Sequence, residues 1–279
     1  MSTSATGKLI HFVARVLRVG LRSRARWFAR RHGLQLNKIG TPYGGWVVVD
    51  GILNDRSTCL CVGCGEDISF DVEIARRHGS LMVLYDPTPR AIAHVEDVLA
   101  AAKEGRRVAI NNSPTQVYDI DSQVSERIQF HPRAVSSVNG LLRLYMPTRS
   151  DFVSCSMLAA GMSEDFIDVE SVTVDEAIRL SGVAPESLDL IKLDIEGAEY
   201  EVIARLLEQR MLPKLICLEL DGLSDRIDGL PQKWRAVQLI WALRRKYFLV
   251  ALDDLNATFL RRDMLVARSS KSGLAGATA

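Results

Sequence analysis

No aspartate or glutamate precedes Asp50 in this chain of 279 residues. Cationic residues are frequent over the same stretch: Lys8, Arg15, Arg18, Arg22, Arg24, Arg26, Arg30, Arg31 and Lys38. Because the whole chain carries a net charge of only +1, its positive charge is concentrated near the amino terminus. This near-neutral balance gives no general attraction for polyanions, so no nucleic-acid partner is expected.

Long apolar runs are also missing. None approaches the ~20 consecutive apolar residues of a membrane-spanning helix, and His11 and Arg15 interrupt the stretch that a secretory signal would need. Apolar residues recur instead at roughly helical spacing: Leu9, Ile10, Phe12, Val13, Val16, Leu17 and Leu21. Residues 1–37 are therefore predicted to be a basic amphipathic segment. Three interpretations are open for this segment: a helix that packs across its own domain, a helix that lies on an anionic membrane surface, or a segment that resembles a transit peptide.

Cysteines are few, and their pattern argues against a disulfide framework. The odd count of five, without a secretory signal, favours reduced thiols and a cytoplasmic location. Cys61 and Cys64 have Cys-x-x-Cys spacing, but no second pair exists and the five histidines are scattered, so no metal site is predicted. Since the pair lies inside a glycine loop, we expect buried thiols rather than redox chemistry.

The composition, 47% apolar and 25% charged, is that of a soluble globular protein. Residues 38–268 are interpreted as one domain, and residues 269–279 as a disordered tail of small and polar residues. Strands are expected at 46–50, 58–62, 81–85, 128–130, 167–174, 188–195 and 215–220, mostly alternating with helices. This alternation predicts an α/β fold with a doubly wound, mostly parallel sheet.

Two hairpins are expected. Asn139-Gly140, between apolar segments 135–138 and 141–145, is a strong turn signal. Strands at 247–252 and 258–266 are joined too tightly for a parallel crossover, so the sheet should end in an antiparallel pair. Asp175 is expected to cap the helix after the strand at 167–174. Residues 106–126 are polar and give no clear assignment.

A glycine loop with a distant acid suggests a cofactor site. Gly63 and Gly65 follow the strand at 58–62. Because glycine has no side chain, the backbone of such a loop can pass close to a bound ligand. Glu66 and Asp67 come next and would repel a pyrophosphate, whereas they would attract an ammonium or sulfonium group. Asp86 follows Gly63 by 23 positions, the spacing at which a carboxylate receives a ribose diol.

Three segments together resemble the FkbM family of S-adenosylmethionine-dependent methyltransferases. They are Cys59-Leu-Cys-Val-Gly-Cys-Gly-Glu-Asp-Ile-Ser-Phe-Asp71, Leu84-Tyr-Asp-Pro-Thr-Pro89 and Ile191-Lys-Leu-Asp-Ile-Glu-Gly-Ala-Glu199. The resemblance extends over roughly residues 40–267. It implies a Rossmann-like class I methyltransferase fold with a seven-stranded sheet. It also implies S-adenosyl-L-methionine as cofactor and a hydroxyl on a small molecule or glycan as methyl acceptor.

The resemblance also implies where the cofactor lies, with Gly63 and Gly65 around its methionine portion and Asp86 on its ribose. The predicted contacts are Gly63, Cys64, Gly65, Glu66, Asp67, Asp86 and Pro87. The chain departs from the family pattern at two positions. Cys61 stands where an acid is usual, and Asp67 stands where a third glycine is frequent. Glu66 or Asp67 is the expected substitute contact for the cofactor's amino group.

Methyl transfer to oxygen needs a group that takes the acceptor's proton. Asp194, at the end of the strand predicted over 188–195, is the first candidate base, and Glu196 is the second. His131 is the third, because an unperturbed imidazole titrates near neutrality. Lys192 shares a strand face with Asp194 and is predicted to hold it through a salt bridge. Asp194 and Glu219 alone are not enough to assert a Mg²⁺ site.

Two other functions stay open at this stage. A nicotinamide-dependent oxidoreductase has a similar topology, but Glu66 and Asp67 would oppose its pyrophosphate and no Tyr-x-x-x-Lys pair is recognisable. A catalytically idle scaffold of FkbM type is suggested by Cys61 at the usual acid position. The sequence identifies neither the acceptor nor the oligomeric state. Substrate specificity is expected in residues 106–127 and 146–166.

Overall fold

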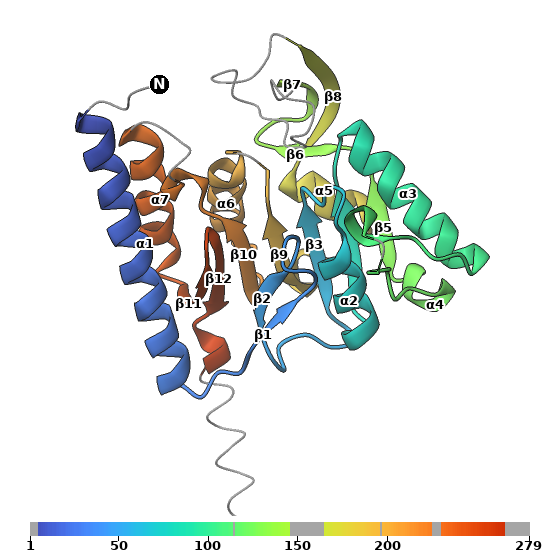
Figure 1. Ribbon diagram of the computed structural model, residues 1–279, viewed down its shortest axis with the longest axis horizontal. Coiled ribbons are helices and arrows are strands. Elements are labelled where there is room, and N and C mark those ends of the chain that lie inside the picture. Colours follow the sequence, from blue (N-terminus) through green and yellow to red (C-terminus); the bar gives the residue numbers. More distant parts are fainter. Residues whose placement is uncertain (1–4, 114, 146–164, 196, 225–229, 266–279) are drawn as a thin grey trace, which may run out of the picture. The chain divides into compact units, whose positions relative to one another are not determined.

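The computed structural model describes residues 5–113, 115–145, 165–195, 197–224 and 230–265 (Figure 1). The chain divides into two compact units. The first unit is Met1–Asn37, Val47–Asp50 and Pro213–Ala279, and the second is Lys38–Trp46 and Gly51–Leu212. The amino-terminal helix therefore belongs with the carboxyl-terminal part of the chain. The tail predicted at 269–279 lies outside the described residues.

A parallel sheet forms the core of the second unit. Its strands, in spatial order, are β9 (Leu188–Leu193), β3 (Thr58–Val62), β4 (Leu81–Tyr85) and β5 (Ile128–His131). Every residue of β3 and β9 is buried. Helices on both faces exclude water from such strands, which is why their sequences read as continuous apolar runs. The predicted strands are confirmed, although β9 ends two residues earlier than expected.

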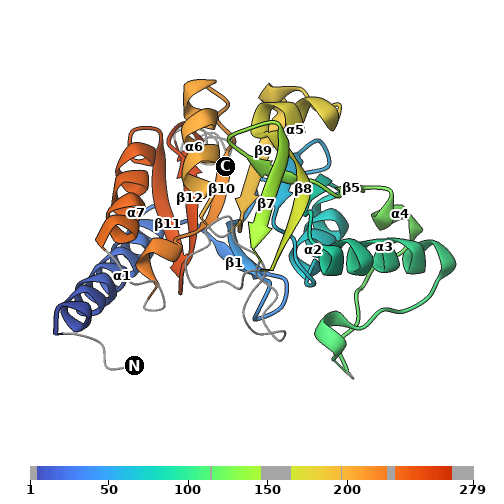
Figure 2. The same ribbon diagram turned by 90° about the horizontal axis from the view of Figure 1, so that it is seen from above.

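Helices flank this parallel sheet, with α2 and α3 on one side and α5 and α6 on the other (Figure 2). Their bounds are Ser69–His78 for α2, Pro89–Glu104 for α3, Val174–Leu180 for α5 and Glu199–Glu208 for α6. Pro89 starts α3 as predicted, and Gly79 and Gly105 end α2 and α3 in the left-handed conformation. The prediction that Asp175 caps α5 is wrong. Asp175 lies in the first turn and binds Arg205 of α6 instead, because that cation offers a stronger partner than the helix end.

Short elements connect these helices and strands. Residues 106–126, which gave no assignment from sequence, contain the 3₁₀ turn η1 (Ile110–Asn112) and the single-turn helix α4 (Ser122–Ser125). A second 3₁₀ turn, η2 (Pro185–Ser187), leads into β9. Among the described residues, β1 (Leu36–Ile39) and β2 (Trp46–Val49) form a two-stranded sheet.

In the described part of the chain, β6 (Ala134–Ser136), β7 (Gly140–Tyr145) and β8 (Phe166–Thr173) form a separate small sheet in the order β6-β8-β7. The hairpin predicted at Asn139-Gly140 is therefore wrong. The longer β8 lies between β6 and β7, parallel to the first and antiparallel to the second. Asn139 does not close a hairpin turn, since its side-chain oxygen accepts a hydrogen bond from the Thr173 amide at 2.7 Å.

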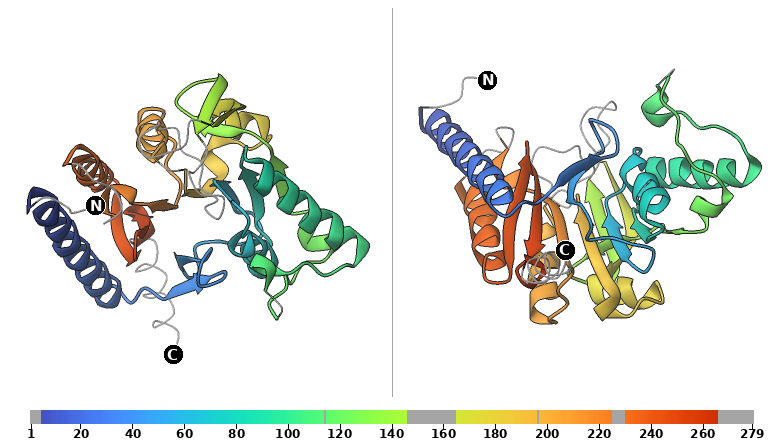
Figure 3. Two further views of the ribbon diagram at one scale, coloured as in Figure 1. Left: turned by 45° about the horizontal axis from the view of Figure 1, so that its top comes forward. Right: turned by 90° about the horizontal axis from the view of Figure 1, so that it is seen from below.

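The described part of the first unit contains antiparallel strands and two α-helices. β11 (Tyr247–Asp253) and β12 (Asn256–Arg261) make the predicted terminal hairpin, and β12 also pairs antiparallel with β10 (Leu215–Glu219). Helix α1 (Ala5–Arg31) runs alongside β11 (Figure 3). Helix α7 (Leu230–Leu243) follows the 3₁₀ turn η3 (Asp221–Leu223). The helix predicted in the leader is thus confirmed.

Among the described residues, the main sheet has seven strands in the order β11-β12-β10-β9-β3-β4-β5. This mixed α/β sheet with an antiparallel terminal pair confirms the predicted fold class. Cys59, Cys61, Cys64 and Cys217 are buried thiols, as expected, and Cys155 lies outside the described residues. No described helix is long and apolar enough to cross a membrane.

Candidate active site

The glycine loop connects β3 to α2 and presses against the end of β9. Gly63 has a φ of +74°, and a Cβ atom there would lie 1.8 Å from the Asp194 carbonyl oxygen. The Gly63 amide donates to Tyr85 O at 2.9 Å, and the Asp194 amide donates to Val62 O at 3.1 Å. Glycine is required at this point because any side chain would overlap the neighbouring backbone. The loop and Asp194 therefore come together at the carboxyl ends of β3 and β9.

Asp86, at the end of β4, ties its own turn to the glycine loop. One carboxylate oxygen accepts from the Gly65 amide at 2.9 Å. The other accepts from the Thr88 amide at 2.9 Å and from the Thr88 hydroxyl at 2.7 Å. Pro87 lies within this turn, and Asp86 is nearly buried at 4% exposure. The structure thus brings together Gly65, Asp86 and Pro87, three of the predicted cofactor contacts.

The two acids after the loop take different positions. Glu66 is half-buried and pairs with Arg90 of α3 at 2.7 Å. Asp67 is buried and accepts hydrogen bonds from Thr41 Oγ1 at 2.6 Å and Asn111 Nδ2 at 2.8 Å. Burial alone raises the pKa of Asp67, but hydrogen bonds from Ser69, Thr41 and Asn111 outweigh burial and lower the pKa. Asp67 therefore stays ionised while it fastens two distant segments to the loop.

Asn111 and Tyr118, from a segment unassigned in the sequence, support the glycine loop. The Tyr118 hydroxyl accepts from the Ile68 amide at 3.2 Å and lies 2.8 Å from His94 Nε2. Asn111 adopts a φ of +51°, a left-handed conformation that Asn tolerates better than most residues. The Asn111-Asn112 pair was a usable turn signal in the sequence. Nothing local connected it to Asp67, which lies 44 positions away.

A buried charge cluster lies beneath the loop. Lys192 is 2% exposed, donates to Gly63 O at 3.2 Å and lies 5.9 Å from the centre of the Trp46 ring. Burial alone lowers the pKa of Lys192, but the negative charges of Asp71, foremost, and Asp194 outweigh burial and raise the pKa. The charge of Asp71, which lies in α2, therefore has a larger effect on the pKa of Lys192 than the predicted partner Asp194 has.

Cys61 occupies the position where the family pattern usually has an acid. It is register-paired with Lys192 on the adjacent strand, and burial, followed by the charge of Asp71, raises the pKa of its thiol. The pKa of the Cys64 thiol is raised as well, by burial, foremost, and by the charge of Asp86. Both thiols therefore stay protonated near neutrality.

Glu199 orders the turn that follows Asp194. Its two carboxylate oxygens accept from the Ile195 amide at 2.8 Å and the Gly197 amide at 2.9 Å. Burial, foremost, and the charge of Asp194 raise the pKa of Glu199 to about 7. Glu196, the second candidate base, lies outside the described residues. Glu199 was noticed in the sequence as an acid of the first helical turn, and the structure assigns it this bracing contact.

The pKa of Glu199 predicts a pH-dependent stability. Since the folded protein holds this proton up to about pH 7 and the unfolded chain releases it near 4.5, stability should fall as pH rises through that window. The fall attributable to Glu199 is on the order of 3 kcal/mol. Glu199→Gln should flatten it in urea unfolding measured between pH 4.5 and 7.5. Glu186→Gln, at an exposed position, is the matched control. An unchanged slope in Glu199→Gln would contradict the prediction.

His131, the third candidate base, lies at the carboxyl end of β5 and stacks on Tyr85 with ring centres 4.6 Å apart. Its Nε2 atom is buried and has no hydrogen-bond partner among the described residues. Burial, foremost, and the charge of Arg133 lower the pKa of His131. The imidazole is therefore neutral near pH 7.

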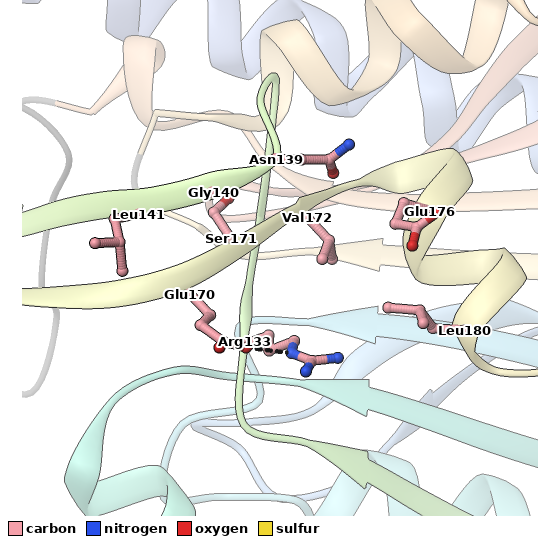
Figure 4. Close-up of a pocket in the computed structure, with 9 residues that line it drawn as sticks. All are labelled: Arg133, Asn139, Gly140, Leu141, Glu170, Ser171, Val172, Glu176 and Leu180. Carbon is pink, nitrogen blue, oxygen red and sulfur yellow. Dashed lines mark hydrogen bonds and ion pairs between the residues drawn. The ribbon is translucent and has the colours of Figure 1, made fainter.

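A cavity of about 480 Å³ lies in the small sheet (Figure 4). Its lining residues are Arg133, Asn139, Gly140, Leu141, Glu170, Ser171, Val172, Glu176 and Leu180. Arg133 and Glu170 form an ion pair at 2.8 Å within it. Because the lining shares no residue with the glycine loop, Asp86 or Asp194, the cavity is separate from the residues at the end of β3.

Residues 58–248 match the methyltransferase FkbM domain. The chain belongs to this family. The match begins at the first residue of β3 and includes the glycine loop, Asp86, Asp194 and Glu199, so the residues described above lie inside the FkbM domain. The predicted resemblance is confirmed.

Other comparisons add little to the FkbM assignment. Among solved structures, this FkbM protein is similar to the crystal structure of a fibrillarin/Nop5p complex. The TM-score is 0.38 and the identity 11%, with 75% of this chain and 74% of that chain covered. A search of curated proteins gives no match. Among the described residues of the FkbM protein, no three His, Cys, Asp or Glu side chains gather as metal ligands.

Proposed function

We propose that this FkbM methyltransferase transfers a methyl group from S-adenosyl-L-methionine to a hydroxyl of a small molecule or glycan. The observation that carries the proposal is that the glycine loop, Asp86 and Asp194 lie together at the carboxyl ends of β3, β4 and β9, respectively. Open α/β sheets bind their ligands at this edge. The neighbouring carboxylates favour a cationic ligand over a pyrophosphate.

The loop fits this cofactor on steric grounds. Gly65 has a φ of +61°, and a Cβ atom built there would meet no atom within 4 Å. The space in front of Gly65 is therefore open, whereas the space at Gly63 is filled by the Asp194 backbone. Asp86 lies one hydrogen bond from Gly65, where a ribose diol would be received. Gly63, Cys64, Gly65, Asp86 and Pro87 would hold the cofactor.

Asp67 is the weakest of the predicted cofactor contacts. Its oxygens already accept hydrogen bonds from Thr41, Ser69 and Asn111. Glu66 forms an ion pair with the exposed Arg90, and breaking an exposed ion pair costs little free energy. Glu66 is therefore the better partner for the cofactor's ammonium group. We assign Asp67 a positioning role in the loop and retain Glu66 as a binding residue.

The bound cofactor supplies an electrophilic methyl group on sulfonium. Asp194 is the proposed base that orients the acceptor hydroxyl and receives its proton. Its backbone is fixed on both sides, through the amide to Val62 and the carbonyl against Gly63. Lys192 and Glu199 position it from beneath and from the following turn. Such rigid support holds a carboxylate within hydrogen-bond reach of one acceptor oxygen.

Calorimetric titration of the purified chain tests the proposal. We expect S-adenosyl-L-methionine to bind with a Kd on the order of micromolar, and NAD⁺, the parallel control, to give no heat. Binding of NAD⁺ alone would replace the proposal with the oxidoreductase alternative. Absence of heat with both ligands, from a chain that unfolds cooperatively, would contradict cofactor binding. Transfer of isotope-labelled methyl to an acceptor hydroxyl then tests the reaction itself.

Gly65→Ala should weaken the cofactor selectively. The new methyl group enters the open space in front of the loop, so affinity for S-adenosyl-L-methionine should fall on the order of tenfold or more, with a stability loss of about 1 kcal/mol from the left-handed backbone. Gly182→Ala is the matched control, because Gly182 has a φ of +67° and equally open surroundings outside the loop. Equal affinities of the two variants would show that the cofactor does not approach Gly65.

A further inference from the structure

Helix α1 has an inner face that packs on its own unit. Ala14, Ala25 and Ala29 are buried there. The Phe28 ring lies 4.5 Å from the Phe248 ring of β11, and Arg22 Nε donates to the Leu252 carbonyl at 3.0 Å. Arg18 adds an ion pair with Asp254 at 3.6 Å. These contacts fix which side of the helix faces the protein and which side faces away.

The outer face of α1 exposes large apolar side chains. Phe12, Val13, Val16, Val19 and Trp27 are each between 55 and 64% exposed. Phe12, Val16, Val19 and Trp27 follow one another at spacings that keep them on one side of a helix. These side chains therefore do not contribute to the packing of α1 against its own unit.

Exposed cations border this apolar stripe. They are Arg15, Arg24, Arg26, Arg30 and Arg31. Arg31 lies over the Trp27 ring, with its guanidinium carbon 5.7 Å from the ring centre. The helix contains no acid from Ala5 to Arg31. The outer face therefore combines apolar area with unopposed positive charge.

We propose that the outer face of α1 docks on the surface of an anionic lipid bilayer. Its apolar side chains would enter the boundary between headgroups and acyl chains, while the arginines meet lipid phosphates. Tryptophan suits this boundary because one part of its ring system is apolar and its N–H is polar. A helix of this length lies flat over about 40 Å. The helix would then hold the FkbM protein at a membrane surface.

The combination of charge and apolar area decides between a bilayer and other partners. A nucleic acid would bind the arginines through its phosphates, but its backbone would make no favourable apolar contact with Val16 and Val19. A second copy of this acid-free face would bring positive charge against positive charge. An anionic bilayer matches both properties on the same strip of helix.

Vesicle co-sedimentation with the full chain tests the proposal. We expect binding to vesicles of equal parts phosphatidylglycerol and phosphatidylcholine at low salt. Binding should weaken on the order of tenfold or more with pure phosphatidylcholine vesicles or at high salt. A wild-type chain that stays in the supernatant with anionic vesicles at low salt overturns the proposal.

Two variants and a control separate the contributions. Arg24→Glu/Arg26→Glu/Arg30→Glu and Phe12→Ser/Val16→Ser/Val19→Ser should each lose on the order of tenfold or more of the partition into anionic vesicles. Arg56→Glu/Arg107→Glu/Arg127→Glu changes the same charge at exposed positions of the second unit and should bind as the wild type does. Circular dichroism confirms that each variant is folded.

The other occupants of this face give distinct results. Equal loss in the control would show that binding follows net charge alone, and it would overturn the assignment to α1. Wild-type binding in the serine variant would do the same. Tighter binding to a DNA or RNA duplex than to vesicles, or α1-dependent self-association in place of vesicle binding, would assign the face to another partner and also overturn the proposal.

Discussion

Asp194→Asn should lower the turnover of methyl transfer by about 10²–10⁴-fold, the usual contribution of a positioned general base. Asparagine keeps the shape of the side chain but cannot take the acceptor's proton. The affinity for S-adenosyl-L-methionine should stay within a few fold, because the contacts of Asp194 with the glycine loop are made by its backbone amide and carbonyl. The effect therefore belongs to kcat rather than to cofactor binding.

The measurement is single-turnover transfer of labelled methyl, with an acceptor found by screening hydroxyl compounds. His131→Gln is the parallel variant, since a neutral imidazole at the end of β5 is the competing base. If Asp194→Asn kept full turnover while His131→Gln lost it, the base would be His131. Full turnover in both variants would show that neither residue is the base, which would then be Glu196 or a water molecule.

Lys192→Met should lower the free energy of unfolding by about 3–5 kcal/mol, because it leaves Asp71 buried without its cation. Asp71 has no exposed surface. Burial, foremost, raises the pKa of its carboxyl, whereas the charge of Lys192 lowers that pKa and so stabilises the carboxylate. Methionine preserves much of the side-chain volume of lysine, so packing under the loop changes little. The loss is thus electrostatic rather than a cavity effect.

A double-mutant cycle checks this explanation. The pair Lys192→Met/Asp71→Leu removes both charges and should recover most of the stability lost in Lys192→Met alone. Urea unfolding gives the four free energies, and Arg106→Met with Asp97→Leu, an exposed ion pair at 2.9 Å, serves as the control cycle with a coupling of about 1 kcal/mol or less. Additive effects of the two substitutions at Lys192 and Asp71 would show that the charges do not interact.

The sequence alone located the parallel strands and the glycine loop of the second unit. The strands β3, β4 and β9 were predicted because residues buried on both faces leave a continuous apolar run, and Pro89 marked the start of α3. Gly63, Gly65 and Asp86 were found because a close backbone approach, and an acid at the spacing expected for ribose binding, depend on residue types at fixed positions. These features are local, so neighbouring residues are enough to specify them.

Only the tertiary structure shows which distant side chains interact with one another. Lys192 was paired with Asp194 from strand periodicity, but Asp71 of α2 has the larger effect on the pKa of Lys192. The Asn139-Gly140 hairpin was wrong because β8, from a later part of the chain, pairs between β6 and β7. The bonds of Asp67 to Thr41 and Asn111 join residues far apart in sequence. Such contacts depend on the order of the strands and on how the helices pack against the sheet. A local sequence pattern does not indicate which distant side chains this packing brings together.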